Sequence, residues 1–230
     1  MFEEKVGDGI ETSTEQSPLV SIVFGTIGRP SHISKCLESI KKFTPIPYEL
    51  VVVVANGHTE TVEILRNTPF CKIIIEENPS GATAAFNKGF VESNGRFIVH
   101  LNDDVEVLDG WITNMLRAIG DQDTLGAFCF FDDAVPSLGF TVYGQNGKPY
   151  ANFGCIRREL FESLGFWDER YIFYGADTDF GLTMWHKGYS VLPVPDARII
   201  HHSAKEGRRS DLREQGPNAL RRKWAGIYDV

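Results

Sequence analysis

The sequence predicts an α/β protein with a mainly parallel, doubly wound sheet, followed by a smaller region that departs from this pattern. Strand-like apolar runs alternate with helical segments three times in the first half of the chain, as expected of strands joined by right-handed crossovers. Residues 49–54 include four consecutive valines, which is typical of a strand buried on both faces of a parallel sheet. The chain of 230 residues, 42% of them hydrophobic, is long enough for one domain with a sizeable core.

In the first half, each of the first three expected strands is followed by an expected helix. Strands are expected at residues 19–24, 49–54, 72–75 and 96–101. Helices are expected from residue 31, at 60–66 and at 81–92. In the first of these helices Ile33, Leu37 and Ile40 recur at helical spacing, and Ser31 is the candidate N-cap.

The second half is less regular. A helix is expected at 111–119, a strand at 126–131, and a hairpin at 141–149 that turns on Gly144 and Asn146-Gly147. A strand and a helix follow within 151–164. After a loop rich in aromatic residues, a helix is expected from about Asp177 and a strand at 197–200.

Composition excludes several functional classes. With 31 acidic and 23 basic residues the net charge is −8, which argues against non-specific binding to nucleic acid or to an anionic membrane, because both need clustered cations. The exception is the stretch 204–230, predicted as a basic C-terminal tail. The four cysteines are widely spaced and predict reduced thiols in a cytoplasmic protein. Residues 1–17, predicted as a disordered leader, lack the features of a signal peptide, and no run approaches the roughly 18 apolar residues of a membrane span.

Asp103 and Asp104 form the strongest local signal for chemistry. An apolar strand, 97–101, runs almost directly into the two carboxylates. In an open parallel sheet, ligands bind beyond the carboxyl ends of the strands. Two acids at that edge suit Mg²⁺ or Mn²⁺, which take oxygen ligands and leave positions for phosphate and water. The alternative is a simple turn in which an aspartate caps the helix at 111–119.

A second acidic pair, Asp177 and Asp179, opens the helix that follows the aromatic loop at 166–174. Aromatic loops of this kind line sugar sites, although each ring also suits the core. Acids in a first turn are equally explained by their attraction to the helix dipole. The two aspartates lie about 200° apart around a helix and therefore cannot share one face.

His201 and His202 close the strand expected at 197–200. Neutral imidazole is a common metal ligand. Because neighbouring residues of a strand point to opposite faces, at most one of the two histidines is expected to point at a site. A surface or core role is the alternative for either.

Taken in order, these motifs make the chain similar to family 2 glycosyltransferases with the GT-A fold, over nearly all of residues 19–203. VSIVFGTIGRP resembles the family's first strand and nucleotide-contacting turn, and VVVVANGHTE resembles its second strand and turn. ENPSGATAAFNKGF and NGRFIVHLNDDVEV resemble the helix and strand that lead to the Asp-x-Asp metal motif. The family's acceptor-side block, which ends in Glu-Asp-x-Asp, has its counterpart in NFGCIRRELFESLGFWDERYIFYGADTDFGLTMWHKGY. The family's late histidine has its counterpart in ARIIHHS.

The resemblance implies one GT-A-type domain at 18–203, with a nucleotide-binding half at 18–108 and an acceptor half at 109–203. It implies inverting transfer of a sugar from a nucleoside diphosphate sugar to the hydroxyl of an unknown acceptor, with Mn²⁺ or Mg²⁺ as cofactor. Asp177 would be the catalytic base, and Asp104 and His201 the metal ligands, with His201 favoured over His202. The residues implied in donor binding are Thr26, Arg29, Asn56, Asn78, Ala82, Asn87 and Asp103.

Three positions depart from the family pattern and keep alternatives open. Ala55 replaces an aspartate of the second-strand turn, Asn102 replaces the first aspartate of Asp-x-Asp, and Ala176 replaces the glutamate before Asp177. The substitutions at Ala55 and Ala176 keep open a nucleotide-sugar or glycan-binding module without turnover as one alternative. A nucleotidyltransferase is another, although it would usually need more basic residues near the first strand than Arg29 alone. A Rossmann dehydrogenase is disfavoured because no G-x-G-x-x-G follows the first strand.

Overall fold

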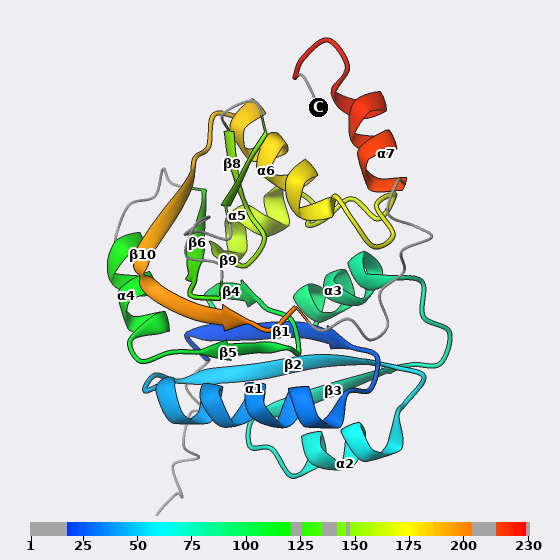
Figure 1. Cartoon of the computed structure of the whole chain (residues 1–230), viewed down its shortest axis with the longest axis vertical. Coiled ribbons are helices and arrows are strands. Elements are labelled where there is room, and N and C mark those ends of the chain that lie inside the picture. Colours follow the sequence, from blue (N-terminus) through cyan, green and yellow to red (C-terminus); the bar gives the residue numbers. More distant parts are fainter. Residues whose placement is uncertain (1–17, 121–125, 135–141, 146–147, 204–214, 229–230) are drawn as a thin grey trace, which may run out of the picture.

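The structure of the chain is a computed structural model that describes residues 18–120, 126–134, 142–145, 148–203 and 215–228 (Figure 1). The predicted leader 1–17 and the predicted turn at Asn146-Gly147 lie outside the described residues. Buried apolar side chains from both halves of the chain form one hydrophobic cluster, which extends along the sequence from Val20 to Trp224. In the described ranges, no helix combines the length and the hydropathy required to cross a membrane.

Four parallel strands make up the first half of the central sheet. β1 (Val20–Thr26) pairs with β2 (Tyr48–Ala55) on one side and with β4 (Phe97–His100) on the other, and β2 pairs with β3 (Cys71–Glu76). The valine run of β2 is buried throughout, as its composition predicts. Because the four strands run the same way, their carboxyl ends lie at one edge of the sheet.

The second half of the sheet is mixed. The eight strands follow the order β3-β2-β1-β4-β9-β6-β10-β5. β9 (Gly154–Arg157) is antiparallel to both β4 and β6 (Ala127–Asp132), whereas β10 (Val191–His201) is parallel to β6 and antiparallel to β5 (Val105–Val107). The chain passes from β6 to β9 by way of a hairpin of β7 (Val142–Gln145) and β8 (Lys148–Ala151), which confirms the hairpin expected there. Antiparallel strands do not need a crossover helix between them, so parallel pairing predominates only in the first half.

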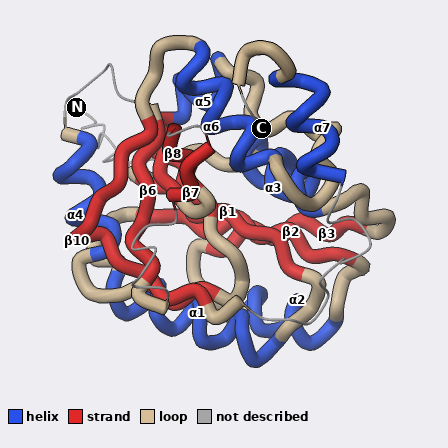
Figure 2. Tube along the Cα trace, turned by 45° about the horizontal axis from the view of Figure 1, so that its top comes forward, coloured by secondary structure: helices blue, strands red, loops and turns tan. Residues whose placement is uncertain are grey.

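Helices cover both faces of the parallel strands (Figure 2). α1 (Pro30–Phe43) and α2 (Thr59–Arg66) lie on one face, and α3 (Ala82–Val91) lies on the other. The remaining helices are α4 (Trp111–Ile119), α5 (Arg158–Ser163), α6 (Ala176–His186) and α7 (Gln215–Trp224). This arrangement confirms the α/β, doubly wound prediction for the first half.

Two helix starts differ from the sequence expectation. α1 begins at Pro30 and its N-cap position is Arg29, so Ser31 is not the cap. Proline suits the first helical position because its φ is already fixed near the helical value. α6 begins at Ala176 after Gly175, which takes the left-handed φ of 98°. The helix therefore starts one residue earlier than expected, and Gly175 rather than an aspartate occupies its N-cap position.

The predicted basic tail contains a helix that packs on the domain. α7 lies beside α6, and its Leu220 and Trp224 are buried in the hydrophobic cluster (Figure 1). These two residues are spaced i, i+4 and therefore share one face of the helix. The residues between them are all charged, which is why the stretch was predicted as a basic tail. The described part of the tail, 215–228, therefore packs on the domain at 18–203 and shares its hydrophobic cluster.

Candidate functional site

The site begins where β1 and β4 end. Asp103 lies three residues beyond β4 and is fully buried. Its Oδ2 accepts a hydrogen bond from Thr26 Oγ1 at 2.6 Å, and Thr26 is the last residue of β1. Arg29 Nε donates to the same oxygen at 3.2 Å, and Arg29 Nη2 bonds Asp103 Oδ1. Burial raises the pKa of Asp103, while the hydrogen bonds from Arg29 and Thr26 act to lower it.

Asp104 connects this group to β10. One of its carboxylate oxygens, Oδ2, is 3.5 Å from Arg29 Nη1, and the other, Oδ1, is 3.3 Å from His201 Nε2. His202 Nε2 instead lies 2.7 Å from Glu106 Oε1. The two histidines therefore face different carboxylates, and His201 is the one beside Asp104. His201 is the last residue of β10, and His202 lies just beyond the strand.

Asp132 holds the end of β10 in place, although it was not among the site residues predicted from the sequence. It is the last residue of β6, is buried, and accepts a hydrogen bond from the backbone N–H of His201 at 3.0 Å. The ring of His201 also meets Phe153 edge-on, with 4.8 Å between centroids. A signal for Asp132 was present, because Asp132-Asp133 follows an apolar strand just as Asp103-Asp104 does.

Three more predicted donor-binding residues lie beyond the carboxyl ends of the parallel strands. Asn56 follows β2 with a positive φ of 55° and is exposed. Asn78 is exposed in the loop after β3, and the half-buried Ala82 is the first residue of α3. The structure thus puts these residues on the edge that carries Asp103, and their contacts with a donor stay predictions.

Asn87 faces the aromatic loop. Its side-chain amide donates to the carbonyl oxygen of Trp167 at 2.8 Å and to Glu169 Oε1 at 3.0 Å, and its oxygen accepts from the backbone N–H of Trp167 at 3.2 Å. The amide is thus engaged on both its nitrogen and its oxygen by the chain itself. The structure shows Asn87 as a tie between α3 and the loop, and a donor contact through this residue stays a prediction.

Asp177 is the second residue of α6 and is half-buried. Its Oδ1 accepts a hydrogen bond from the backbone N–H of Thr178 at 2.8 Å. Desolvation raises the pKa of Asp177 to about 6, against the lowering effect of the nearby backbone N–H groups. A carboxyl group with such a pKa changes its charge near neutral pH, which suits a group that accepts and releases protons.

The segment before α6 reaches the same edge of the sheet as Asp103. Thr83, in the first turn of α3, donates its backbone N–H to the carbonyl oxygen of Ile172 at 3.2 Å and its hydroxyl to the carbonyl oxygen of Tyr171. Since α3 starts just beyond the carboxyl end of β3, these contacts bring residues 171–172 to that edge. The loop that leads into α6 is therefore held at the start of α3, on that side of the sheet.

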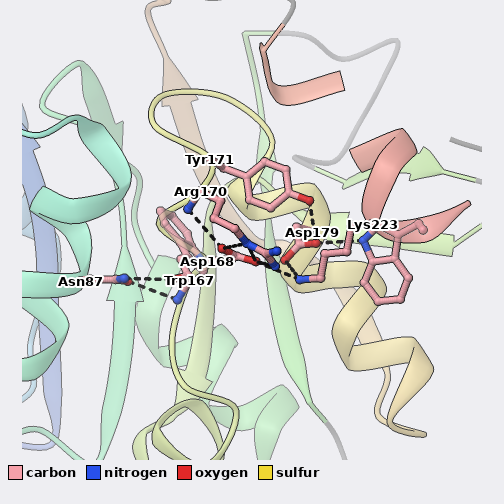
Figure 3. A network of polar contacts seen from close by, with 8 residues as sticks. Asn87, Trp167, Asp168, Arg170, Tyr171, Asp179 and Lys223 are labelled. Atoms are coloured by element: carbon pink, nitrogen blue, oxygen red, sulfur yellow. Dashed lines mark hydrogen bonds and ion pairs between the residues drawn. The ribbon is translucent and has the colours of Figure 1, made fainter. Parts of the chain in front are cut away.

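Asp179, the other acid of the pair in α6, has structural partners. It is buried and accepts hydrogen bonds from Tyr171 Oη at 3.0 Å, Lys223 Nζ at 2.7 Å and Trp224 Nε1 at 2.8 Å (Figure 3). A carboxylate held by three donors is poorly placed to take a proton from a substrate. Between the two acids of α6, the geometry favours Asp177 for chemistry.

The residues beside Asp104 suit a divalent cation that is shared with a ligand. Within the described ranges, no group of three or more His, Cys, Asp or Glu side chains is arranged to hold a metal. Asp104 and His201 supply one carboxylate and one imidazole, 3.3 Å apart. Mg²⁺ and similar cations are usually held by one or two carboxylates, with phosphate and water completing the coordination. The pair fits a metal bound together with a diphosphate.

Solved structures show which class of fold this is. The mannosyltransferase PcManGT from Pyrobaculum calidifontis, in complex with GDP-Man and Mn²⁺, superposes with a TM-score of 0.67 at 19% identity, over 84% of this chain and 59% of that one. The chain therefore has the GT-A fold.

The sequence comparisons give the family. The model of glycosyl transferase family 2 matches residues 21–180, and the chain belongs to this family. It is 27% identical over 230 residues to the O-antigen biosynthesis protein RfbC of Myxococcus xanthus, covering 85% of this chain but only 18% of that protein. It is 28% identical over 218 residues to the glycosyltransferase YwdF of Bacillus subtilis, an uncharacterized protein, covering 84% of this chain and 78% of YwdF.

Proposed function

We propose that the chain is an inverting glycosyltransferase that uses a nucleoside diphosphate sugar and a divalent metal. The observation that carries this proposal is the group of Thr26, Arg29, Asp103, Asp104 and His201 at the carboxyl edge of four parallel strands. Family membership supports the reaction class. The complex of PcManGT with GDP-Man and Mn²⁺ supports the donor class and the metal.

Asp104 and His201 would hold the metal. When bound, it would supply positive charge for the departing diphosphate. An imidazole nitrogen is a better ligand for Mn²⁺ than for Mg²⁺, so the presence of His201 favours Mn²⁺ of the two proposed cofactors. Asp132 holds the backbone of His201, and the ring of His201 packs edge-on against Phe153.

The donor would lie along the edge of β1–β4. Asp103 would accept hydrogen bonds from the ribose, and Thr26 and Arg29 would lie beside the base or the diphosphate. Asn56 would lie near the base. Asn78, Ala82 and Asn87 would form the neighbouring wall, with Asn87 acting through the loop that it holds.

Asp177 would be the base on the acceptor side. It would take the proton of the acceptor hydroxyl as the hydroxyl oxygen bonds to the anomeric carbon. The bond from that carbon to the diphosphate breaks on the opposite side, and the diphosphate leaves with the electron pair. Attack opposite the leaving group inverts the anomeric centre. The reaction needs one carboxylate away from the diphosphate, and Asp103 and Asp104 already face the donor edge.

We also propose that the chain works in the cytoplasm. Its four cysteines are free, and three of them are buried. Free thiols are the usual state in that reducing compartment.

Thermal shift with a panel of nucleoside diphosphates tests the proposal. UDP, GDP, ADP, CDP and dTDP are each added with Mn²⁺, with Mg²⁺ and with EDTA. We expect one or two of them to raise the melting temperature when a metal is present, because a ligand stabilises the folded state that binds it. Stabilisation by none of the five, or equal stabilisation in EDTA, would contradict the proposal.

A binding module without turnover is the second candidate, and it is the substitutions at Ala55 and Ala176 that keep it open. The two candidates differ in one measurement. The sugar conjugates of the nucleotide selected by the panel are incubated with the protein and Mn²⁺. Metal-dependent hydrolysis of the conjugate identifies an enzyme, while tight binding without any release of sugar identifies a binding module.

Removing the carboxylate of Asp103 should weaken binding of the free nucleoside diphosphate. Asp103→Ala loses a hydrogen-bonded ribose contact, which is worth on the order of 1–3 kcal/mol. Isothermal titration with the nucleotide selected by the panel measures the loss. Asp109→Ala is the matched control, because Asp109 is an exposed acid six positions further along the chain. Equal affinity of Asp103→Ala and the control would show that the ribose lies elsewhere.

A further inference from the structure

The C-terminal helix α7 is held against α6 by a buried carboxylate. Asp179 is only 2% exposed and accepts hydrogen bonds from two residues of α7, Lys223 and Trp224, at 2.7 and 2.8 Å. Tyr171, from the loop before α6, donates to the same oxygen of Asp179 as Trp224 does, at 3.0 Å. Figure 3 shows Tyr171, from the loop, and Lys223, from α7, both reaching Asp179.

Lys223 joins α7 to the loop as well. Its Nζ lies 3.2 Å from Asp168 Oδ2, in addition to its bond with Asp179 (Figure 3). Asp168 in turn holds Arg170 within the loop, with 2.9 Å between Oδ1 and Nε. One ammonium group thus bridges a carboxylate of the loop and a carboxylate of α6. Removing it would leave the buried Asp179 without its cation, a change that strongly destabilises such pairs.

The backbone of α7 also touches the residues that lead into α6. A Cβ added to Gly216 would lie 2.2 Å from the carbonyl oxygen of Tyr174, so only glycine allows this approach. A Cβ added to Gly175 would lie 3.5 Å from Leu220 Cδ1 and 3.3 Å from the Cα of Gly216. α7 therefore packs directly on Tyr174 and Gly175, immediately before the turn that carries Asp177.

The opposite side of the same loop is tied to the donor half. Asn87 bonds Trp167 and Glu169, and Thr83 bonds the carbonyl oxygens of Tyr171 and Ile172. The segment 167–175 is consequently fixed between α3 on one side and α7 on the other. α3 lies within the family match at residues 21–180, whereas α7, at 215–224, lies outside it.

We infer that α7 contributes to the acceptor side of the site, and that Lys223 is a positioning residue for Asp177. By bridging Asp168 and Asp179, Lys223 fixes the loop and the first turn of α6, and so sets where the Asp177 carboxylate lies. The inference rests on the proposed function, in which Asp177 is the base. Small misplacement of a catalytic group is enough to lower a rate by about 10²-fold.

Lys223→Met tests this inference, with Arg222→Met as the matched control. Both variants remove one positive charge from adjacent positions of α7, but Arg222 is exposed. Hydrolysis of the sugar nucleotide selected by the panel gives kcat and KM. We expect Lys223→Met to lower kcat by about 10- to 100-fold with an unchanged KM for the donor, and Arg222→Met to match the wild type. Lys223→Arg, which keeps the cation, should recover most of the rate.

Hydrogen exchange provides a measurement that does not depend on turnover. Backbone amides of 167–179 should exchange faster in Lys223→Met than in Arg222→Met, while those of β1–β4 stay unchanged. If Lys223→Met does not fold, Trp224→Phe removes one donor to Asp179 while keeping an aromatic ring in the core, and should have the same effects in weaker form.

The outcomes separate the inference from the proposed function. Wild-type protein that neither binds nucleoside diphosphates nor hydrolyses their sugar conjugates would contradict the proposed function, and hydrogen exchange would still test the tie between α7 and the loop. With an active wild type, a kcat of Lys223→Met equal to that of Arg222→Met overturns the inference. Unchanged exchange at 167–179 overturns it as well. A loss of kcat with the same loss in Arg222→Met also overturns it, because the effect would then follow surface charge.

Discussion

Replacing Asp177 by asparagine is expected to lower turnover by about 10²–10⁴-fold, the usual contribution of a general base. Binding of the nucleoside diphosphate should change little, because Asp103, Arg29 and Thr26 form their group at the ends of β1 and β4. The fold should also be retained, since the asparagine oxygen still accepts the hydrogen bond that Asp177 receives from Thr178 at 2.8 Å. Steady-state hydrolysis or transfer, together with a melting curve, measures both effects.

The pH dependence of the wild-type rate provides a second measurement on Asp177. A base works only when it is deprotonated, so the rate should rise with pH and reach half its maximum near the raised pKa of about 6. Below that pH the carboxyl group is protonated and the rate should fall about tenfold per pH unit. Asp177→Asn should lose this rise.

A purely structural Asp177 predicts a different result. Gly175 occupies the N-cap position of α6, so an acid at Asp177 would contribute mainly through the helix dipole, worth about 0.3–1 kcal/mol. Asp177→Asn would then melt slightly lower and turn over at nearly the normal rate. That outcome would remove Asp177 from the mechanism. Asp179 would not replace it easily, because Tyr171, Lys223 and Trp224 already occupy its oxygens.

Replacing Asp104 by alanine is expected to abolish the metal-dependent part of nucleotide binding. Asp104 and His201, 3.3 Å apart, are the proposed metal ligands, and a single remaining imidazole would hold Mn²⁺ only weakly. Titration of the nucleoside diphosphate in Mn²⁺ and then in EDTA should show a large difference for the wild type. For Asp104→Ala the two titrations should coincide.

Glu106→Ala is the matched control for that experiment. Glu106 is a carboxylate two residues away that pairs with His202 instead of His201. The control should bind nucleotide in Mn²⁺ as the wild type does. If Asp104→Ala keeps the full effect of Mn²⁺, or if the control loses it equally, the metal ligands have been assigned to the wrong carboxylate.

The first half of the fold could be predicted because its signals are local. The strands β1, β2 and β4 are continuous apolar runs, as burial on both faces of a sheet requires. β1 and β2 are each followed by a helix of clear periodicity. The same regularity predicted that Asp103 would follow a strand at the ligand-binding edge. The contacts of Asp103 with Thr26 and Arg29 span more than 70 positions and became visible only in the structure.

For the histidine pair, local sequence does not decide which ring lies beside Asp104. Strand alternation predicted that at most one of the two histidines would point at the site. Which one it is depends on β10 lying between β6 and β5, where Asp132 fixes the backbone of His201. That neighbourhood is a property of the assembled sheet and has no local signature.

The sequence by itself determined the parallel half of the sheet, the acidic pair at its edge and the resemblance to the family. Only the tertiary structure decided that Asp179 is a structural anchor, that Asn87 holds the aromatic loop, and that a basic stretch contains a helix packed on the domain. The physical reason is distance along the chain. Periodicity reports which face of an element is buried, whereas the bond from Lys223 to Asp179 joins residues 44 positions apart and exists only because α7 packs on α6.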